Sequence, residues 1–230
     1  DNQSDNSKAV SAAQQLITSG VSVVLGSYGS GVSIAAGQIF ADAKIPAIGA
    51  SCTNPQVTEG NPYYFRICFL DPFQGTVMAN FAYEKGLRKA AVLTEAGDDY
   101  SVGLGHYFSE AFKKLGGSVV EAQFQSGETD FSATMASLVS AGVDVLFAPS
   151  SIESAPLIIK QARNAGLTGP IMAGDTWENE TIITNAGDAA YEVYLSAFFD
   201  PNDTSAAAKE FVEGYTEWLK ADNTRLTNNG

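Results

Sequence analysis

The sequence predicts an α/β protein of two lobes, each built on a mostly parallel sheet. Strand and helix signals alternate along the whole chain, which is typical of parallel sheets covered by helices. The strand segments are short, continuous apolar runs, as expected for strands buried on both faces. The pattern restarts at Asp71-Pro72, where proline stands at the first helical position that it favours. A chain of 230 residues, 45% of them hydrophobic, is long enough for two small lobes.

The first lobe begins with a helix that ends near Ser19. Asp5 and Ser7 offer N-caps for this helix, and Gly20 stops it. A second helix of small residues is expected at 32–43. Short apolar runs predict three strands, at residues 21–25, 45–48 and 64–68.

The second lobe continues the alternation of strands and helices. Its first helix opens at Asp71 and ends at Gly86. Strands are expected at residues 90–94, 118–124, 143–148, 171–173 and 191–198. Helices are expected at residues 100–115, 131–141, 155–165, 181–186 and 205–220. We therefore assign residues 1–70 and 198–230 to the first lobe and residues 71–197 to the second.

The charge balance excludes several classes of partner. The chain carries 13 basic and 26 acidic residues, a formal net charge of −13. Nucleic acids and anionic membrane surfaces attract a basic face, so we expect no nucleic-acid partner. The simplest role of this charge is solubility. No apolar run is long enough to span a bilayer, and no secretory segment opens the chain, so we expect one to be removed or to lie upstream.

Two loops that follow strands of the first lobe predict a site for an anion, because ligands of open α/β sheets bind beyond the carboxyl ends of the strands. The loops 26–31 and 49–55 are rich in glycine and hydroxyl groups, and the first leads into a helix whose N–H groups attract an anion. Ser30, Ser51 and Thr53 offer further donors. Neither loop contains Lys or Arg, which favours a carboxylate over a phosphate. Such loops are also common as plain tight turns, and that alternative stays open.

Loops of the second lobe have the opposite character. Asp175 lies in a short loop between apolar segments, and Tyr100 and Trp177 have aromatic faces that suit a cation. Together these three side chains predict a site for an ammonium group. The alternatives are that Asp175 caps the next helix and that the aromatic rings belong to the core.

The sequence lacks the residues of common enzyme sites. His106 is the only histidine, which leaves out most Ser-His and Cys-His arrangements, and Asp98-Asp99 is better explained as a helix cap. We therefore expect no catalysis and no cofactor. The two cysteines, Cys52 and Cys68, are too few for a structural zinc site. They form either a disulfide or two reduced, buried thiols, and their spacing does not decide between these.

Several motifs resemble one known family. They are ASCTNP at 50–55, TEGNPYYFR at 58–66, DPFQG at 71–75 and QARNAGL at 161–167. Together they resemble the leucine/isoleucine/valine-binding proteins, which are type I periplasmic binding proteins of ABC importers. The resemblance extends from Asp1 to about Trp218. It implies two Rossmann-like lobes with mostly parallel sheets and the ligand between them. Relative to this family, we expect the chain to be truncated at both ends.

The resemblance also implies roles for the residues of the two predicted sites. Ser30, Ser51 and Thr53 are expected to hold the α-carboxylate and part of the α-ammonium group of an amino acid. Tyr100 and Asp175 are expected to complete the ammonium site. These roles agree with the anion and cation ends that the loops themselves indicate.

Other positions concern the ligand's side chain. By the resemblance, Tyr28 lines the side-chain pocket. Asp175 stands where the branched-chain binders have glutamate, and Ser151 stands where they can have tyrosine. Trp177 or a larger ligand is then expected to fill the space at Ser151.

The function implied is that of an extracytoplasmic solute-binding protein. It captures an amino acid or a similar small zwitterion by hinge closure of two lobes and delivers it to an ABC transporter membrane permease. Contact with the membrane is expected only through the permease or a lipid anchor, in the periplasm or on the cell surface. The alternative is a ligand-sensing domain of a receptor or regulator with the same fold.

Overall fold

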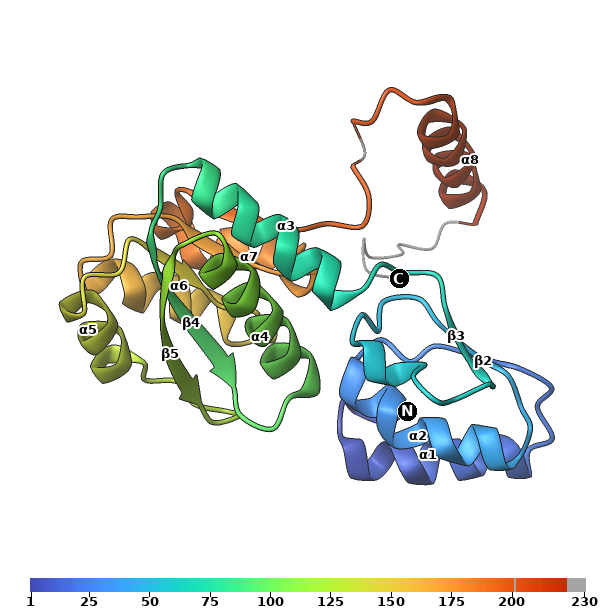
Figure 1. Ribbon diagram of the computed structural model, residues 1–230. Coiled ribbons are helices and arrows are strands. Elements are labelled where there is room, and N and C mark those ends of the chain that lie inside the picture. Colours follow the sequence, from blue (N-terminus) through green and yellow to red (C-terminus); the bar gives the residue numbers. More distant parts are fainter. Residues whose placement is uncertain (201, 223–230) are drawn as a thin grey trace.

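The computed structural model describes residues 1–200 and 202–222. Its strands form two separate parallel sheets, one with the order β1-β2-β3 and one with the order β5-β4-β6-β7-β8. Figure 1 shows each sheet in a lobe of its own, the early residues in one and the middle of the chain in the other. The α/β class with parallel sheets, which the alternating signals predict, is therefore confirmed.

In the first lobe, helices cover one face of the three-stranded sheet. Its elements are α1 (Asn6–Thr18), β1 (Val24–Leu25), α2 (Ser30–Asp42), β2 (Ala47–Gly49), η1 (Pro55–Val57) and β3 (Tyr64–Arg66). Val24, Ala47 and Tyr64 are register partners and pack in one cluster with residues of α1 and α2. Because successive strand residues point to opposite faces, Leu25 and Phe65 lie on the other face and are 79% and 52% exposed.

The strands of this lobe are shorter than the apolar runs that predict them. The run 21–25 contributes only its last two residues, and the run 45–48 enters the sheet at Ala47. Pro46 has no N–H to donate, so the ladder between β1 and β2 begins after it. The expected N-cap of α1 is confirmed, because the Asp5 side chain accepts hydrogen bonds from the first turn of the helix.

In the second lobe, helices cover both faces of the five-stranded sheet. Its elements are α3 (Asp71–Glu84), β4 (Lys89–Glu95), α4 (Asp99–Lys114), β5 (Ser118–Phe124), α5 (Ser132–Ser140), β6 (Val145–Phe147), α6 (Ala155–Asn164), β7 (Ile171–Ala173), η2 (Asp175–Trp177), α7 (Glu180–Ala186), η3 (Gly187–Ala190) and β8 (Val193–Leu195). Ala91 and Leu93 of β4 pack with α5, α6 and α7, whereas Ala90 and Val92 pack with α3 and α4. Burial on both faces is why this strand is a continuous apolar run.

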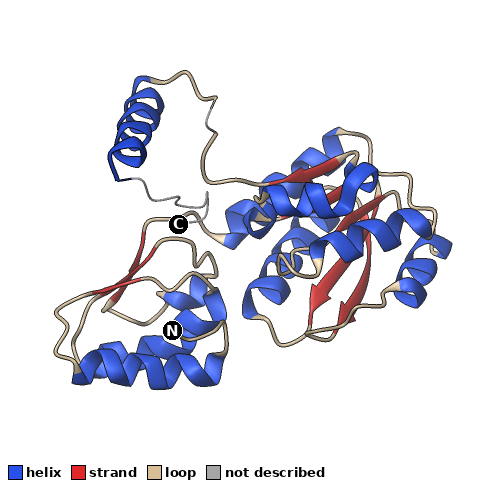
Figure 2. Cartoon of the chain, turned by 180° about the vertical axis from the view of Figure 1, so that it is seen from behind, coloured by secondary structure: helices blue, strands red, loops and turns tan. Residues whose placement is uncertain are grey.

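Two stretches of chain leave the sheets. Residues 67–70 join β3 to α3, and after β8 the chain continues to α8 (Ala206–Asp222). Figures 1 and 2 show α8 standing apart from both sheets. The lobe boundaries after residues 70 and 197 remain a prediction, and residues 223–230 of the predicted first lobe lie outside the described residues. Within the part that the structure describes, no helix combines the length and the apolarity needed to cross a bilayer.

Candidate functional site

The two first-lobe loops that predict the anion site lie against each other. Ser51 Oγ donates to the carbonyl oxygen of Tyr28 at 3.0 Å, and the backbone N–H of Asn54 donates to Ser30 Oγ at 3.1 Å. Ser30 is buried at the start of α2. The hydroxyl groups of Ser30 and Ser51 therefore join the loops 26–31 and 49–55 to each other, and any contact with a ligand comes in addition to these bonds.

Thr53 has a buried hydroxyl group that makes no well-oriented hydrogen bond within the described part of the protein. The residue is fully buried, and its Oγ1 atom has no hydrogen-bond partner among the described residues. It lies beside the Asp71 carboxyl group, and its carbonyl oxygen accepts from Asp71 N at 3.1 Å. A buried polar atom without a well-oriented partner is costly, and the neighbouring Asp71 carboxyl group offsets part of that cost.

Arg66 is a structural residue of this site, and the composition of the loops that follow the strands does not indicate it. Its guanidinium group donates to three carbonyl oxygens and one hydroxyl group of the segment 52–58. The acceptors are Cys52 O at 2.7 Å, Asn54 O at 2.9 Å, Pro55 O at 3.1 Å and Thr58 Oγ1 at 2.8 Å. The loop 49–55 contains no cationic side chain of its own. The Arg66 guanidinium group, from the end of β3, instead fixes the shape of that loop. The only signal in the sequence is that Arg66 ends the TEGNPYYFR motif.

Tyr100 and Asp175 meet in the second lobe, as the ammonium site requires. Tyr100 Oη donates to Asp175 Oδ1 at 2.9 Å, and both side chains are buried. Asp98 caps α4, as expected, by accepting from Tyr100 N. A Cβ atom at Gly174 would lie 2.1 Å from Tyr100 Oη, so only glycine permits this approach. Asp175 does not cap α7, whose cap is Asn179, so the alternative role for this aspartate is not observed.

Burial governs the ionisation of this pair. It raises the pKa of Asp175, against the opposing effect of the hydrogen bonds from Tyr100 and Gln74. It also raises the pKa of Tyr100 well above its ordinary value, and the charge of Asp175 adds to that rise. Tyr100 thus stays a hydrogen-bond donor. In the described part of the chain, Asp175 makes no ion pair, so its charge is offset by hydrogen bonds alone.

A buried glutamine connects the two predicted ends of the site. Gln74 Nε2 donates to Asp71 Oδ1 at 3.2 Å, while Gln74 Oε1 accepts from Asp175 N at 3.1 Å and from Ser196 Oγ at 2.5 Å. Through Asp71 this network reaches Thr53 of the first lobe. The sequence predicts Asp71 as the start of a helix and shows Gln74 within the DPFQG motif, and neither pattern indicates a role in the site.

Asp71 is the most deeply buried carboxyl group of this network. It is fully buried, and its Oδ2 atom has no hydrogen-bond partner among the described residues. Burial raises its pKa to about 7, against the effect of the neighbouring Thr53 hydroxyl group, and the charge of Asp175 raises it further. At neutral pH, Asp71 is therefore partly protonated.

The residues predicted around the ligand's side chain differ in position. Tyr28 is 52% exposed, and the burial of its other half and then the charges of Asp175, Glu178 and Glu153 raise its pKa. This first-lobe ring therefore lies near carboxylates of the second lobe. Ser151 Oγ lies 3.3 Å from Ser154 Oγ. Trp177 is 1% exposed and packs in the second-lobe core.

Trp177 is thus a core aromatic residue, which is the alternative that the sequence leaves open. Its Nε1 atom donates to the carbonyl oxygen of Ser150 at 3.2 Å, which satisfies the indole N–H inside the core. An indole held in this way supports the η2 loop that carries Asp175. It offers no exposed ring face to a cation, so the structure assigns it a supporting position instead.

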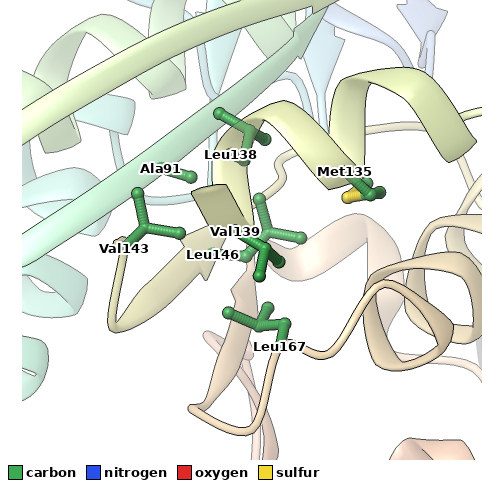
Figure 3. A pocket seen from close by; sticks show the side chains of 7 residues that line it. All are labelled: Ala91, Met135, Leu138, Val139, Val143, Leu146 and Leu167. Atoms are coloured by element: carbon green, nitrogen blue, oxygen red, sulfur yellow. The ribbon is translucent and has the colours of Figure 1, made fainter. Parts of the chain in front are cut away.

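The small cavity of Figure 3 is separate from these residues. It has a volume of about 10 Å³ and lies in the second lobe between α5 and the sheet. Only apolar side chains line it, namely Ala91, Met135, Leu138, Val139, Val143, Leu146 and Leu167. A space of about the size of one water with no polar partner is a packing defect and not a ligand site.

Comparison with known proteins agrees with this architecture. Residues 1–228 match a family model described as periplasmic binding protein. A Leu/Ile/Val-binding protein homolog of Brucella abortus is 32% identical over 221 residues, which cover 94% of this chain and 59% of that protein.

Solved structures of similar proteins superpose closely. A leucine-binding protein from Thermotoga maritima has a TM-score of 0.91 and 36% identity, over 96% of this chain and 64% of that one. A branched-chain amino-acid substrate-binding protein from Streptococcus pneumoniae, in complex with isoleucine, has a TM-score of 0.85 and 32% identity, over 98% of this chain and 64% of that one. This chain thus spans about three fifths of the length of these relatives. By its matched residues and its fold, the chain belongs to the periplasmic binding protein family that includes the Leu/Ile/Val-binding proteins.

Proposed function

We propose that this chain forms the ligand-binding lobes of an extracytoplasmic solute-binding protein of an ABC importer. Its ligand is an amino acid or a similar small zwitterion, which a membrane permease then receives. The relatives known as leucine-binding and isoleucine-bound proteins make aliphatic amino acids the first ligands to test. The role is binding without catalysis, because the site residues offer hydrogen bonds and one negative charge to the ligand.

The observation that carries this proposal is the buried pair of Tyr100 and Asp175. A buried carboxylate without a cation is costly, so a ligand ammonium group has much to gain there. The Thr53 hydroxyl group lies in the loop that predicts the anion site and makes no well-oriented hydrogen bond within the described residues, which supports the opposite end of a zwitterion there. Gln74 and Asp71 connect these two ends by direct contacts.

Hinge closure is the mechanism we propose for this capture. The ligand contacts residues of both lobes, and a ligand that binds the closed state more tightly shifts the equilibrium toward it. Micromolar affinity corresponds to about 8 kcal/mol, and each charge-assisted hydrogen bond contributes roughly 1.5–3 kcal/mol. A few such bonds at each end, together with burial of the ligand's side chain, are sufficient.

Calorimetry of the full-length protein with a panel of amino acids tests the proposal. At least one amino acid should bind, and Asp175→Asn should weaken that binding by roughly 30-fold or more, since one charge-assisted contact is lost. An ammonium group beside Asp175 lowers its raised pKa, so binding should release protons in acidic buffers where the carboxyl group of the free protein is partly protonated. The measured heat should then depend on the ionisation enthalpy of the buffer.

The control variant is Asp188→Asn, which removes an exposed carboxylate of the second lobe outside this network. It should bind as the unchanged protein does. The amino-acid assignment fails if no member of the panel gives heat. The ammonium role of Asp175 fails if Asp175→Asn binds as tightly as the unchanged protein.

A further inference from the structure

Cys52 and Cys68 lie on two chain segments that run side by side beyond the ends of β2 and β3. The pairing of the two strands continues past them, since Ile67 N donates to Gly49 O at 3.1 Å and Asp71 N donates to Thr53 O at 3.1 Å. Cys52 and Cys68 fall between these two bonds, one on each segment. Each thiol is close enough to shift the pKa of the other, and both are free thiols in this structure.

The surroundings hold Cys52 in this position. Its side chain is fully buried, and its Sγ atom is so close to Gly49 that a Cβ atom there would lie 2.0 Å from it. Arg66 fixes the backbone by donating to Cys52 O at 2.7 Å. Cys68 is only partly buried, so one sulfur is accessible to a reagent and the other is held behind it.

We propose that Cys52 and Cys68 are a redox-active pair whose disulfide fastens the loop 49–55 to the segment 67–71. That loop carries Ser51 and Thr53 of the proposed ligand site, and the segment is the passage into the second lobe. Oxidation therefore holds the anion end of the site against the start of α3. The pair is a modification site in addition to the ligand site and does not depend on it.

The chemistry needs a disulfide oxidant and balances as thiol–disulfide exchange. The accessible Cys68 sulfur, as a thiolate, attacks the oxidant and expels one thiolate, which takes up a proton. Cys52 loses its proton to solvent and attacks the Cys68 sulfur of the mixed disulfide, which expels the second thiolate, and this is protonated too. The protein gives up two electrons and two protons, and one disulfide of the oxidant becomes two thiols.

The ionisation of the pair favours Cys52 as the nucleophile of the second step, in which the mixed disulfide at Cys68 is resolved. The hydrogen bond from Cys68 lowers the pKa of Cys52, with help from Ser33 and the Arg66 charge, while the same bond and burial raise the pKa of Cys68. The buried sulfur thus holds negative charge more readily. It is the better placed of the two to attack a mixed disulfide formed at Cys68.

The test uses the unchanged protein equilibrated with oxidised or reduced glutathione at neutral pH. After unfolding in the presence of an alkylating reagent, the reduced form should gain two adducts. The oxidised form should gain none and should weigh about 2 Da less than the unmodified reduced chain, for the two hydrogen atoms lost. Closing the loop should raise the midpoint of thermal unfolding by roughly 5–10 °C.

The matched control is the double variant Cys52→Ala with Cys68→Ala, whose unfolding midpoint should not respond to glutathione. If this variant fails to fold, the mass and alkylation of the unchanged protein still decide. The proposal is overturned if two thiols stay reactive after oxidation, or if glutathione stays attached without closing the pair. None of these measurements needs an amino-acid ligand, so the proposal fails or holds independently of the proposed function.

Discussion

Asp71 shows how the fold alters a single side chain. The carboxyl group is fully buried, one of its oxygens accepts from Gln74, and the other has no hydrogen-bond partner in the described part of the chain. Burial is the main reason that its pKa rises to about 7 from an ordinary value of 3.8. Between these two values the folded chain retains a proton that the unfolded chain has released.

This difference gives the stability of the protein a pH dependence with a definite sign. As pH rises from about 4 to about 7, the contribution of Asp71 to the free energy of unfolding should fall, and above about 7 it should level off. Asp71→Asn cannot ionise, and its amide can donate to the neighbouring hydroxyl oxygen of Thr53. Relative to the unchanged protein, this variant should gain roughly 2–4 kcal/mol between pH 5 and pH 8.

Urea unfolding at several pH values measures this effect. Asp188→Asn serves as the control for loss of one surface charge, because Asp188 is exposed. A constant difference between Asp71→Asn and the unchanged protein across this pH range would show that Asp71 does not titrate as its burial implies.

Among the elements, α3 and α4 approach each other closely at Gly75. A Cβ atom at Gly75 of α3 would lie 2.7 Å from Phe108 N and 2.9 Å from the carbonyl carbon of Tyr107, both in the backbone of α4. Backbone atoms cannot move aside as a flexible side chain does. Gly75→Ala should therefore lower the free energy of unfolding by roughly 1–3 kcal/mol, as measured by urea unfolding.

Gly214 of α8 provides the matched comparison for this substitution. It also lies inside a helix, but a Cβ atom there meets no atom within 4 Å. Gly214→Ala should leave stability unchanged or raise it by roughly 0.5–1 kcal/mol, because alanine favours the helix. Equal losses in both variants would contradict the close approach of α3 to α4.

The elements also show what the sequence can predict. Strand β5 and the N-cap Asp98 are found correctly, because local patterns and neighbouring residues determine them. Strand β1 is predicted too long, because its length depends on a partner strand that begins only after Pro46. The local sequence pattern predicts the length of a strand correctly only where the partner strand extends over the same residues.

In the candidate site, too, local sequence predicts some residues, and contacts between distant residues determine others. Loop composition indicates Thr53 and Asp175 because both follow strands. The role of Gln74 arises from contacts with residues about a hundred positions away, so no local pattern contains it. Trp177 could belong to the ligand site or to the core by sequence alone, and only its packing decides.

At the scale of the whole molecule, the lobes meet beside the candidate site. Asn54 Nδ2 of the first lobe donates to the carbonyl oxygen of Asp99 of the second at 2.8 Å. A Cβ atom at Gly103 would lie 2.8 Å from the same Asn54 nitrogen, and one at Gly31 would lie 3.1 Å from an oxygen of the Asp99 side chain. Small residues thus let α2 and the loop 49–55 approach α4 directly.

The uncovered face of the three-stranded sheet affects how molecules of this chain behave toward each other in solution. Leu25, Phe65 and Ile67 form an exposed apolar row, and the net charge of −13 opposes the approach of a second molecule. Salt shortens the range of that repulsion from about 10 Å at 0.1 M to about 3 Å at 1 M. Light scattering should therefore report a hydrodynamic radius that grows with salt concentration.

Leu25→Lys, which puts a charge at the β1 end of this row, should suppress the growth. A radius that stays constant over the same salt range would show that the row does not drive self-association. In colloidal terms, the chain resembles a charged particle that carries an attractive apolar patch. Its tendency to stay dispersed should therefore depend on ionic strength more than that of a particle whose sheets are covered on both faces.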